Sequence, residues 1–370
     1  MPLKNIVTSS LTAQLSDLPP GDTIEVSVFG KGIGECVVVH LGAGEWLIAD
    51  SLIDSSAGCP VALDYLRGIG VDVTTAVKLV VVTHWHRDHT DGIAELFEQT
   101  ASAEVVFSQA LRSAEFRELL GRDKVLSPAN SSLAEMRSLI EILRERRRKD
   151  GQQPGGPTWA LENRLLRKTP DGDVFSLSPS DGAISLALRE IRSLITSEGA
   201  SVGRLCAQRP NETCIVLSVR LGDKVVILGA DLEAGRDATL GWKAIAGSRT
   251  RPHMRASCFK IPHHGSSNAH EPLVWETLFT PSRIGVLTPY RALRNPIPTS
   301  QDIERLLTCT TQLYCAGGLA AVRGPRRPSS VEKLIAGRLH SAEARMGHVR
   351  ARFPPAGTAI VDTFGSAKRL

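Results

Sequence analysis

The sequence predicts a mixed α/β fold, and three observations support this prediction. Short apolar or alternating segments, typical of strands, recur along the chain, for example at residues 23–29 and 78–83. Amphipathic segments typical of helices lie between them, for example at residues 60–68. Hydrophobic residues make up 42% of the 370 residues and charged residues 22%, which is the balance of a globular protein that buries a sizeable core.

Strands and helices are expected in turn along the first third of the chain. The alternating segment 23–29 is followed by Gly30, Gly32 and Gly34, which form a flexible turn into the next strand. The expected strands are residues 23–29, 36–41, 45–49, 78–83 and 104–107. The expected helices are residues 60–68 and 93–99.

Residues 108–198 fit this strand-rich pattern less well, and we predict that they form an insertion over one face of the core. Within them, residues 131–149 predict an amphipathic, basic helix, and the Gly- and Pro-rich residues 151–157 predict a loop. Strands then resume, and their expected positions are residues 214–219, 224–228 and 258–261.

The domain organisation follows from this order of elements. One core domain is predicted at residues 20–325, and residues 326–370 complete the same domain. This last part is expected to contain a helix at 331–345 and a closing hairpin made of residues 348–353 and 359–364.

The composition bears on the expected cellular compartment and on the expected binding partners. No apolar run is long enough to span a membrane and the first residues lack a signal-type apolar core, so we expect a cytoplasmic protein that does not enter membranes. Seven widely spread cysteines without a C-x-x-C pair argue against a disulfide framework and a zinc ribbon. The net charge of +5 gives a mild attraction for polyanions such as nucleic acid.

The chemistry is predicted by a cluster of four ligand-type side chains. His84, His86, Asp88 and His89 follow the buried segment 78–83, so they emerge on a loop that the core anchors. Imidazole and carboxylate groups are ligands suited to zinc or manganese. The alternative, a surface loop that happens to hold three histidines, does not explain the dense spacing.

This H-x-H-x-D-H cluster resembles the signature of the metallo-β-lactamase superfamily. The resemblance implies a four-layer αβ/βα sandwich with a metal centre at one edge, here with a helical insertion. It further implies two divalent ions, with zinc expected and manganese as the alternative. His84 and His86 would bind the first ion, and Asp88 and His89 the second.

The resemblance also implies a later Asp that bridges both ions and a last histidine on the second ion. Asp231 follows an apolar strand and is the candidate bridge, although an Asp at such a place more often caps a helix. The pair His263 and His264 supplies the last ligand. We assign His263 as the ligand and His264 as a catalytic group that donates a proton or contacts the substrate, and the exchanged assignment stays open.

One feature departs from the superfamily pattern, because no histidine occurs between His89 and His253 to complete the first metal site. Asn211 occupies roughly the expected place, and a turn residue at a strand edge is the equal alternative. Asp50, at the end of the strand 45–49, is expected to position a ligand histidine rather than bind metal.

Within the superfamily, the chain resembles the branch that contains the C-terminal domain of ComEC-type competence proteins. The glycine-rich turn, Asn211, the segment Ala230–Asp231 and the run His-His-Gly-Ser at 263–266 parallel that branch.

The function implied is hydrolysis by a metal-bound hydroxide, in which Asp88 and His264 are the candidate catalytic groups. We predict a phosphodiesterase or nuclease that acts on nucleic acid or a nucleotide. Besides the resemblance, the basic stretches at 144–149 and 323–327 support this substrate class, although each could be only a solvated face. The alternatives are a hydrolase of a lactam, thioester or other acyl bond and, outside enzymes, a metal-binding scaffold.

Overall fold

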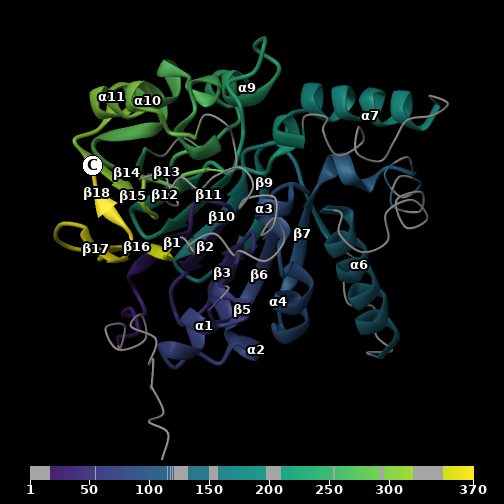
Figure 1. Cartoon of the computed structure of the whole chain (residues 1–370), viewed down its shortest axis with the longest axis horizontal. Helices are drawn as coiled ribbons and strands as arrows, with labels where there is room; N and C mark the ends of the chain where they lie inside the picture. The colour runs from purple at the N-terminus through teal and green to yellow at the C-terminus, as the bar shows by residue number, and fades with distance from the viewer. Residues whose placement is uncertain are drawn as a thin grey trace, which may run out of the picture.

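Two eight-stranded sheets lie face to face, with helices on their outer faces, in the computed structural model (Figure 1). The predicted four-layer αβ/βα sandwich is therefore confirmed. The residues that the structure describes are 17–54, 56–114, 116, 118, 120, 132–149, 157–196, 210–252, 255–291, 296–319 and 345–370.

The first sheet has the strand order β17-β16-β1-β2-β3-β6-β7-β8. Neighbours from β17 to β3 are antiparallel, and those from β3 to β8 are parallel. Its strands are β1 (Ile24–Gly30), β2 (Glu35–His40), β3 (Trp46–Ala49), β6 (Val77–Val82), β7 (Glu104–Ser108), β8 (Thr158–Ala160), β16 (Gly347–Phe353) and β17 (Ile360–Gly365). All five strands predicted in the first third of the chain are present in this sheet.

The second sheet has the order β18-β15-β14-β13-β12-β11-β10-β9, and β12 to β15 are parallel. Its strands are β9 (Arg164–Lys168), β10 (Gly172–Ser176), β11 (Leu217–Leu221), β12 (Lys224–Leu228), β13 (Ala256–Lys260), β14 (Phe279–Leu287), β15 (Gln312–Cys315) and β18 (Lys368–Arg369). A separate short pair consists of β4 (Ile53–Asp54) and β5 (Cys59–Pro60).

Helices form the two outer layers. On the side of the first sheet are α1 (Val61–Gly68), α2 (Val73–Ala76), α4 (Ile93–Gln99) and α6 (Ser132–Lys149), and on the side of the second are α9 (Gly241–Gly247), α10 (Pro272–Leu278) and α11 (Ser300–Cys309) (Figure 1). The remaining helical segments are α3 (Arg87–Thr90), α7 (Asp181–Thr196), η2 (Gln109–Arg112), η3 (Pro210–Thr213), η4 (His263–Gly265) and η5 (Ser267–Ala269). None of the helices described here is both long and apolar enough to cross a membrane.

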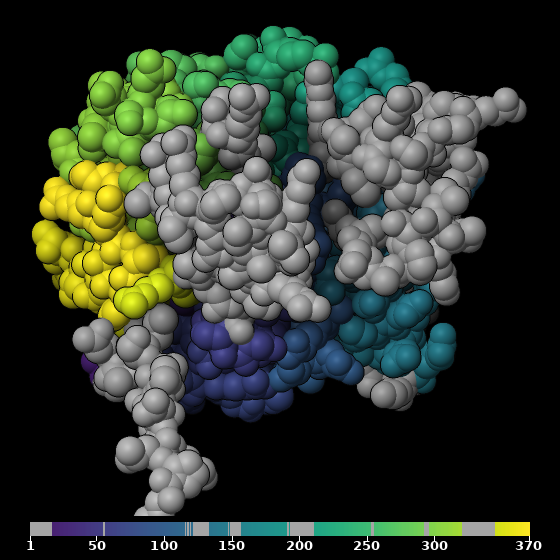
Figure 2. Space-filling view, in the orientation of Figure 1, coloured from purple at the N-terminus to yellow at the C-terminus, as the bar shows by residue number. Residues whose placement is uncertain are grey.

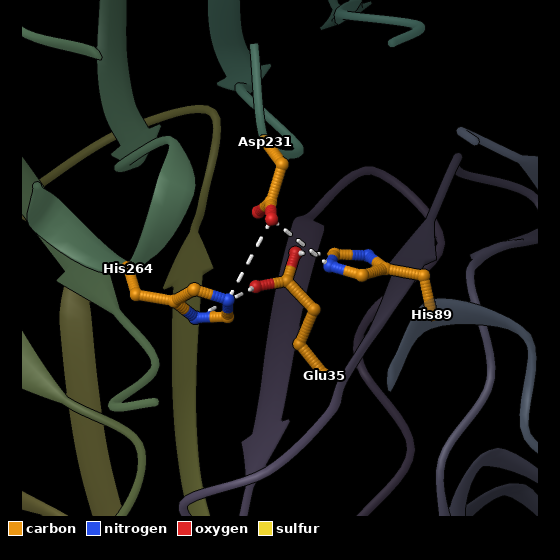
Figure 3. A group of neighbouring side chains, drawn as sticks. All are labelled: Glu35, His89, Asp231 and His264. Carbon is orange, nitrogen blue, oxygen red and sulfur yellow. Dashed lines mark ion pairs between the residues drawn. The ribbon is translucent and has the colours of Figure 1, made fainter. Parts of the chain in front are cut away.

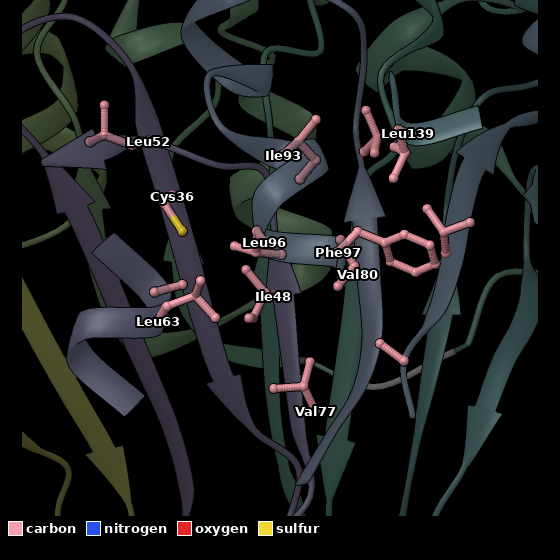
Figure 4. Packing of buried hydrophobic residues seen from close by; sticks show 14 of the residues in the cluster. Cys36, Ile48, Leu52, Leu63, Val77, Val80, Ile93, Leu96, Phe97 and Leu139 are labelled. Atoms are coloured by element: carbon pink, nitrogen blue, oxygen red, sulfur yellow. The ribbon is translucent and has the colours of Figure 1, made fainter. Parts of the chain in front are cut away.

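The apolar strand β6 contributes side chains to two buried layers, one on each face of the first sheet. Its side chains alternate between the faces of the sheet, so Leu79 and Val81 enter the core between the sheets while Val80 and Val82 pack under the helices. In the helix-covered layer, Val80 belongs to the same buried cluster as Leu96 and Phe97 of α4 (Figure 4). Burial on both faces anchors the loop that follows β6, which carries the ligand cluster.

Part of the predicted insertion at 108–198 belongs to the core instead. Strand β8 pairs with β7 at the edge of the first sheet, and β9 and β10 extend the second sheet next to β11. These strands escaped prediction because β8 has only three residues and β9, an edge strand, is largely exposed and basic. The predicted helix at 131–149 is present as α6, which packs against α4.

The C-terminal residues contribute to both sheets. The predicted hairpin is present as β16 and β17, and β16 pairs with β1 along its whole length, from Ile24 opposite Phe353 to Gly30 opposite Gly347. Strand β18 pairs with β15 in the second sheet. In Figure 2 these C-terminal residues, in yellow, lie beside the green residues of the second half of the chain. The predicted helix at 331–345, apart from Arg345, and the basic loop at 323–327 lie outside the described residues.

His348 on β16 offers a test of this packing. Its ring stacks on Phe29, with centroids 4.2 Å apart, and on Phe364, 5.1 Å away, and neither ring nitrogen has a hydrogen-bond partner in the described structure. Burial, and then the nearby charge of Arg350, lower the pKa of His348 well below its usual value. The folded protein therefore keeps this ring neutral while the unfolded chain protonates it below about pH 6.5.

We expect His348→Phe to keep the stacked rings. The free energy of unfolding of this variant should fall less at acid pH than that of the wild type. As pH falls below about 6.5, one extra proton on the unfolded wild-type chain costs up to about 1.4 kcal/mol of unfolding free energy per pH unit, and the variant lacks this loss. Urea unfolding at pH 7.5, 6.0 and 5.0 measures it. Parallel pH profiles for the two proteins would contradict the assignment of a neutral buried ring.

Candidate metal centre

The candidate ligands lie where parallel strands of both sheets end. The cluster at 84–89 follows β6, Asp231 follows β12, and His263 and His264 follow β13. Backbone hydrogen bonds tie these ends together: Ile215 N donates to the Thr83 carbonyl, and His263 N donates to the Ala230 carbonyl. The carboxyl ends of parallel strands are a common place for binding sites in such sheets.

Four donor atoms converge at one point, which we call the second candidate site. The Nε2 atoms of His89 and His264 lie 3.4 and 3.6 Å from Asp231 Oδ2, and 3.7 and 3.8 Å from Asp88 Oδ2. Two ligands on one tetrahedral zinc ion lie about 3.4 Å apart, given metal–ligand distances of about 2.1 Å. The spacing therefore fits one shared divalent ion. His89 Nε2 is buried without a hydrogen-bond partner among the described residues, as a donor that awaits a metal would be.

A second group of donors forms what we call the first candidate site. His84 Nε2 and His86 Nδ1 lie 3.1 Å apart, and the Asp231 carboxylate lies within 4.8 Å of both. Asp231 Oδ2 faces the second site, whereas its Oδ1 is buried and has no hydrogen-bond partner in the described structure. Asp231 thus lies between the two groups, where a bridging carboxylate is expected. The alternative role as a helix cap does not apply, because the next helix, α9, has Leu240 at its N-cap.

Asp50 fixes the orientation of His84 and His89 through hydrogen bonds on the Nδ1 side of their rings. Its carboxylate accepts hydrogen bonds from Thr83 N (2.9 Å), Thr83 Oγ1 (2.7 Å) and His89 Nδ1 (2.7 Å). Thr83 Oγ1 in turn lies 2.9 Å from His84 Nδ1, and since its proton goes to Asp50, it accepts one from His84. The Nδ1 atoms of both imidazoles are thereby engaged, which leaves Nε2 for a metal.

The two adjacent histidines differ in their surroundings. His264 is buried, its Nδ1 lies 3.1 Å from Thr288 Oγ1 and 3.2 Å from the Thr288 carbonyl, and its Nε2 points to Asp231 (Figure 3). His263 lies beside the cluster and is partly exposed. The geometry therefore favours His264, not His263 as we predicted, as the candidate ligand of the second site. Both residues have positive φ, 46° and 55°, a backbone conformation that no sequence pattern revealed.

Asn211 and His263 form a polar pair on the side of the first site. Asn211 Nδ2 lies 3.4 Å from His263 Nε2, and Asn211 Oδ1 is buried without a hydrogen-bond partner among the described residues. The charge of a protonated His263 would act on both His84 and His86, which shows that this pair adjoins the first site. No other histidine of the described residues supplies a third imidazole there.

The pKa values of His84 and Asp231 fit the protonation states that metal binding requires, whereas His89 has to release a proton when a metal binds. Burial, and then the neighbouring His89 and His86, lower the pKa of His84 well below its usual value, so its imidazole is neutral. Burial raises the pKa of Asp231, but the charges of His89 and His264 outweigh this effect and hold it well below its usual value. Burial likewise lowers the pKa of His89, whereas Asp231 and Asp50 raise it well above normal. The same carboxylates would attract a divalent cation.

Short stretches of this chain are similar to known lactamase-like proteins. The "Lactamase-like protein nscB" of Arthroderma benhamiae is 31% identical over 99 residues, which cover 25% of this chain and 23% of that protein. The proteins of the same name from Neosartorya fischeri and Aspergillus fumigatus are each 30% identical over 93 residues, or 24% of this chain and 28% of theirs. The matches thus span about a quarter of each relative.

Among solved structures, the metallo-beta-lactamase fold protein YhfI from Bacillus subtilis is 10% identical, with a TM-score of 0.38. That similarity covers 78% of this chain and 95% of that one, and at this TM-score it carries no argument about activity. No family model matches the chain.

Several side chains around the candidate metal centre were missed in the sequence. Glu35, Lys260 and Thr288 are buried directly behind the histidines of the second site. Tyr290 stacks on His264 with ring centroids 5.0 Å apart. The available signals were a glutamate that ends the glycine-rich turn and a lysine inside an apolar strand. A buried charge there requires a partner.

Proposed function

We propose that this protein is a metal-dependent hydrolase of the metallo-β-lactamase superfamily. We propose that it binds two divalent ions, with zinc as the expected metal and manganese as the alternative. The convergence of two imidazole and two carboxylate donors on one point carries the proposal, since His89 Nε2 is buried there with carboxylates nearby but without a hydrogen-bond partner among the described residues. His89, His264 and Asp88 would bind the second ion, His84 and His86 the first, and Asp231 both.

The protein's own groups can be assigned roles around these ions. When bound, two such ions supply Lewis acidity at the scissile bond and lower the pKa of a water molecule. Asp231 would fix the separation of the two sites, and Asp50 would hold His84 and His89 in their ligand tautomers. His263 and Asn211, beside the first site, are placed to donate hydrogen bonds to the substrate.

For the substrate we propose a phosphodiester, in a nucleic acid or nucleotide, as in the ComEC-type branch. The run His-His-Gly-Ser at 263–266, which places His264 in the second site, supports this assignment. The basic helix α6 gives weaker support to a phosphodiester substrate than its positive charge alone suggests. Arg146 covers the Phe97 ring at 3.8 Å and donates to the carbonyls of Glu98 and Thr100 at the end of α4, so its charge serves the fold.

An acyl bond is the second candidate substrate. The name "Lactamase-like protein" of the three relatives favours it, since it places them near enzymes of that class. Nearly the same set of metal ligands serves both kinds of bond, so the substrate has to be settled by assay.

The proposal is tested in two steps. The purified protein, stripped with chelator and titrated with zinc or manganese, is expected to bind two equivalents, and binding of none would end the metalloenzyme proposal. The loaded protein is then assayed on single-stranded DNA, duplex DNA, RNA, cyclic nucleotides, bis(p-nitrophenyl) phosphate and a chromogenic cephalosporin. We expect turnover of phosphodiesters. Turnover of the cephalosporin alone would favour the acyl alternative, and tight metal binding without turnover would favour a metal-binding scaffold.

A further inference from the structure

A buried ion pair between Glu35 and Lys260 lies directly behind the second candidate site. Glu35 begins β2 in the first sheet and Lys260 ends β13 in the second, and each is only 1% exposed. Lys260 Nζ contacts Glu35 Oε1 and donates to the Ala230 carbonyl at 3.1 Å. The second carboxylate oxygen of Glu35 accepts a hydrogen bond from Thr288 Oγ1 at 2.7 Å.

The position of Glu35 argues that it is not a metal ligand, although it lies near three of them. Its oxygens lie 3.9 Å from the Nδ1 atoms of His89 and His264, which is the side of each ring opposite the metal-facing Nε2 (Figure 3). Both oxygens are already engaged, one by Lys260 and the other by Thr288. Glu35 therefore lies behind the ligands.

The pair also connects the two sheets at the point where their ligands meet. Asp88 and His89 come from the segment after β6 in the first sheet, whereas Asp231 and His264 follow strands of the second. Lys260 holds the carbonyl of Ala230, a residue with φ of 45° that directly precedes Asp231. The spacing of the four donors thus depends on contacts that run through this ion pair.

We propose that the Glu35–Lys260 pair positions the ligands of the second metal site, through Ala230 for Asp231 and through Thr288 for His264. The inference rests on the proposed metal centre. Groups that orient metal ligands typically change metal affinity by about 10-fold to 100-fold when removed. A group that supplied only charge would behave differently, because removal of the Lys260 cation would then tighten the binding of a dication.

Lys260→Met distinguishes these two roles. We expect it to leave the first equivalent of zinc bound as in the wild type and to raise the Kd of the second by about 10-fold or more, as measured by competition with a chromogenic chelator. The matched control is Glu25→Gln, which breaks the ion pair of the buried Glu25 with the partly buried Arg352 (2.7 Å) far along β1 from the site. The control is expected to lower the thermal midpoint of the metal-free protein without any change in zinc affinity.

A second pair of variants applies even if Lys260→Met does not fold. Thr288→Val keeps the shape of a fully buried side chain but removes its hydroxyl, whereas Thr288→Ser keeps the hydroxyl. We expect the second zinc equivalent to weaken about 10-fold in Thr288→Val and to stay within about 2-fold of the wild type in Thr288→Ser.

The outcomes separate this inference from the proposed function. A wild-type protein that binds no zinc would remove the metal centre itself. A wild type that binds two equivalents, with Lys260→Met or Thr288→Val binding the second as tightly or more tightly, would overturn only the positioning role. Complete loss of the second equivalent in Glu35→Gln, with unchanged affinity in Thr288→Val, would instead make Glu35 a ligand.

Discussion

Asp231→Asn is expected to lower hydrolysis by about 10²- to 10³-fold, the loss typical when one charge-stabilising group is removed from an active site. The carboxylate lies between the two donor groups, with Oδ2 facing His89 and His264 and Oδ1 without a partner in the described structure. An amide has no charge and offers only one acceptor atom, so it cannot serve two cations at once. Retention of the second ion should weaken as well.

Turnover of bis(p-nitrophenyl) phosphate and elemental analysis of the same samples measure this effect. Asp223→Asn is the control, because Asp223 lies exposed in the turn between β11 and β12 and pairs with the neighbouring Lys224 at 3.0 Å. The control should keep normal activity and metal content. An Asp231→Asn protein that is fully active and normally metallated would show that the bridging role is misassigned.

His264→Ala and His263→Ala are expected to separate metal binding from substrate contact. His264→Ala removes a donor of the second site, so the protein should lose one equivalent of zinc and about 10²- to 10³-fold in kcat. His263→Ala removes a side chain beside the first site that contacts Asn211. His263→Ala should keep both equivalents of zinc. Its effect should appear as a changed KM.

Zinc titration of both variants, together with their circular dichroism spectra, tests this distinction. The spectra establish that each variant is folded. Loss of an equivalent in His263→Ala combined with full metal content in His264→Ala would make His263 the ligand of the second site instead.

The first sheet and the ligand cluster were predictable because their signals are local. The run at β6 is apolar on both faces, and the ligands follow it within a few residues, so periodicity and spacing were sufficient. The central strands β11 and β12 were found for the same reason, as two apolar segments around a tight turn at Gly222.

The remaining features depend on contacts between distant parts of the chain. Strands β9 and β10 belong to the second sheet only because β10 pairs with β11, and β9 itself is polar. The choice between His263 and His264 depends on two positive φ angles. The role of Glu35 depends on Lys260, which lies in another sheet, and a buried ion pair of this kind leaves no periodic trace in the sequence.

The pairing of β1 with β16 has a consequence for how the protein is made. These strands lie side by side in the first sheet, yet one begins at Ile24 and the other ends at Phe353, so the long stretch between them must be synthesised before they can meet. Non-local strand pairing of this kind slows folding, because a very large loop must close first. Until then β1 has an open edge, which is prone to aggregation during translation. Efficient production of the protein should therefore depend on slow synthesis or on chaperones that shield this edge.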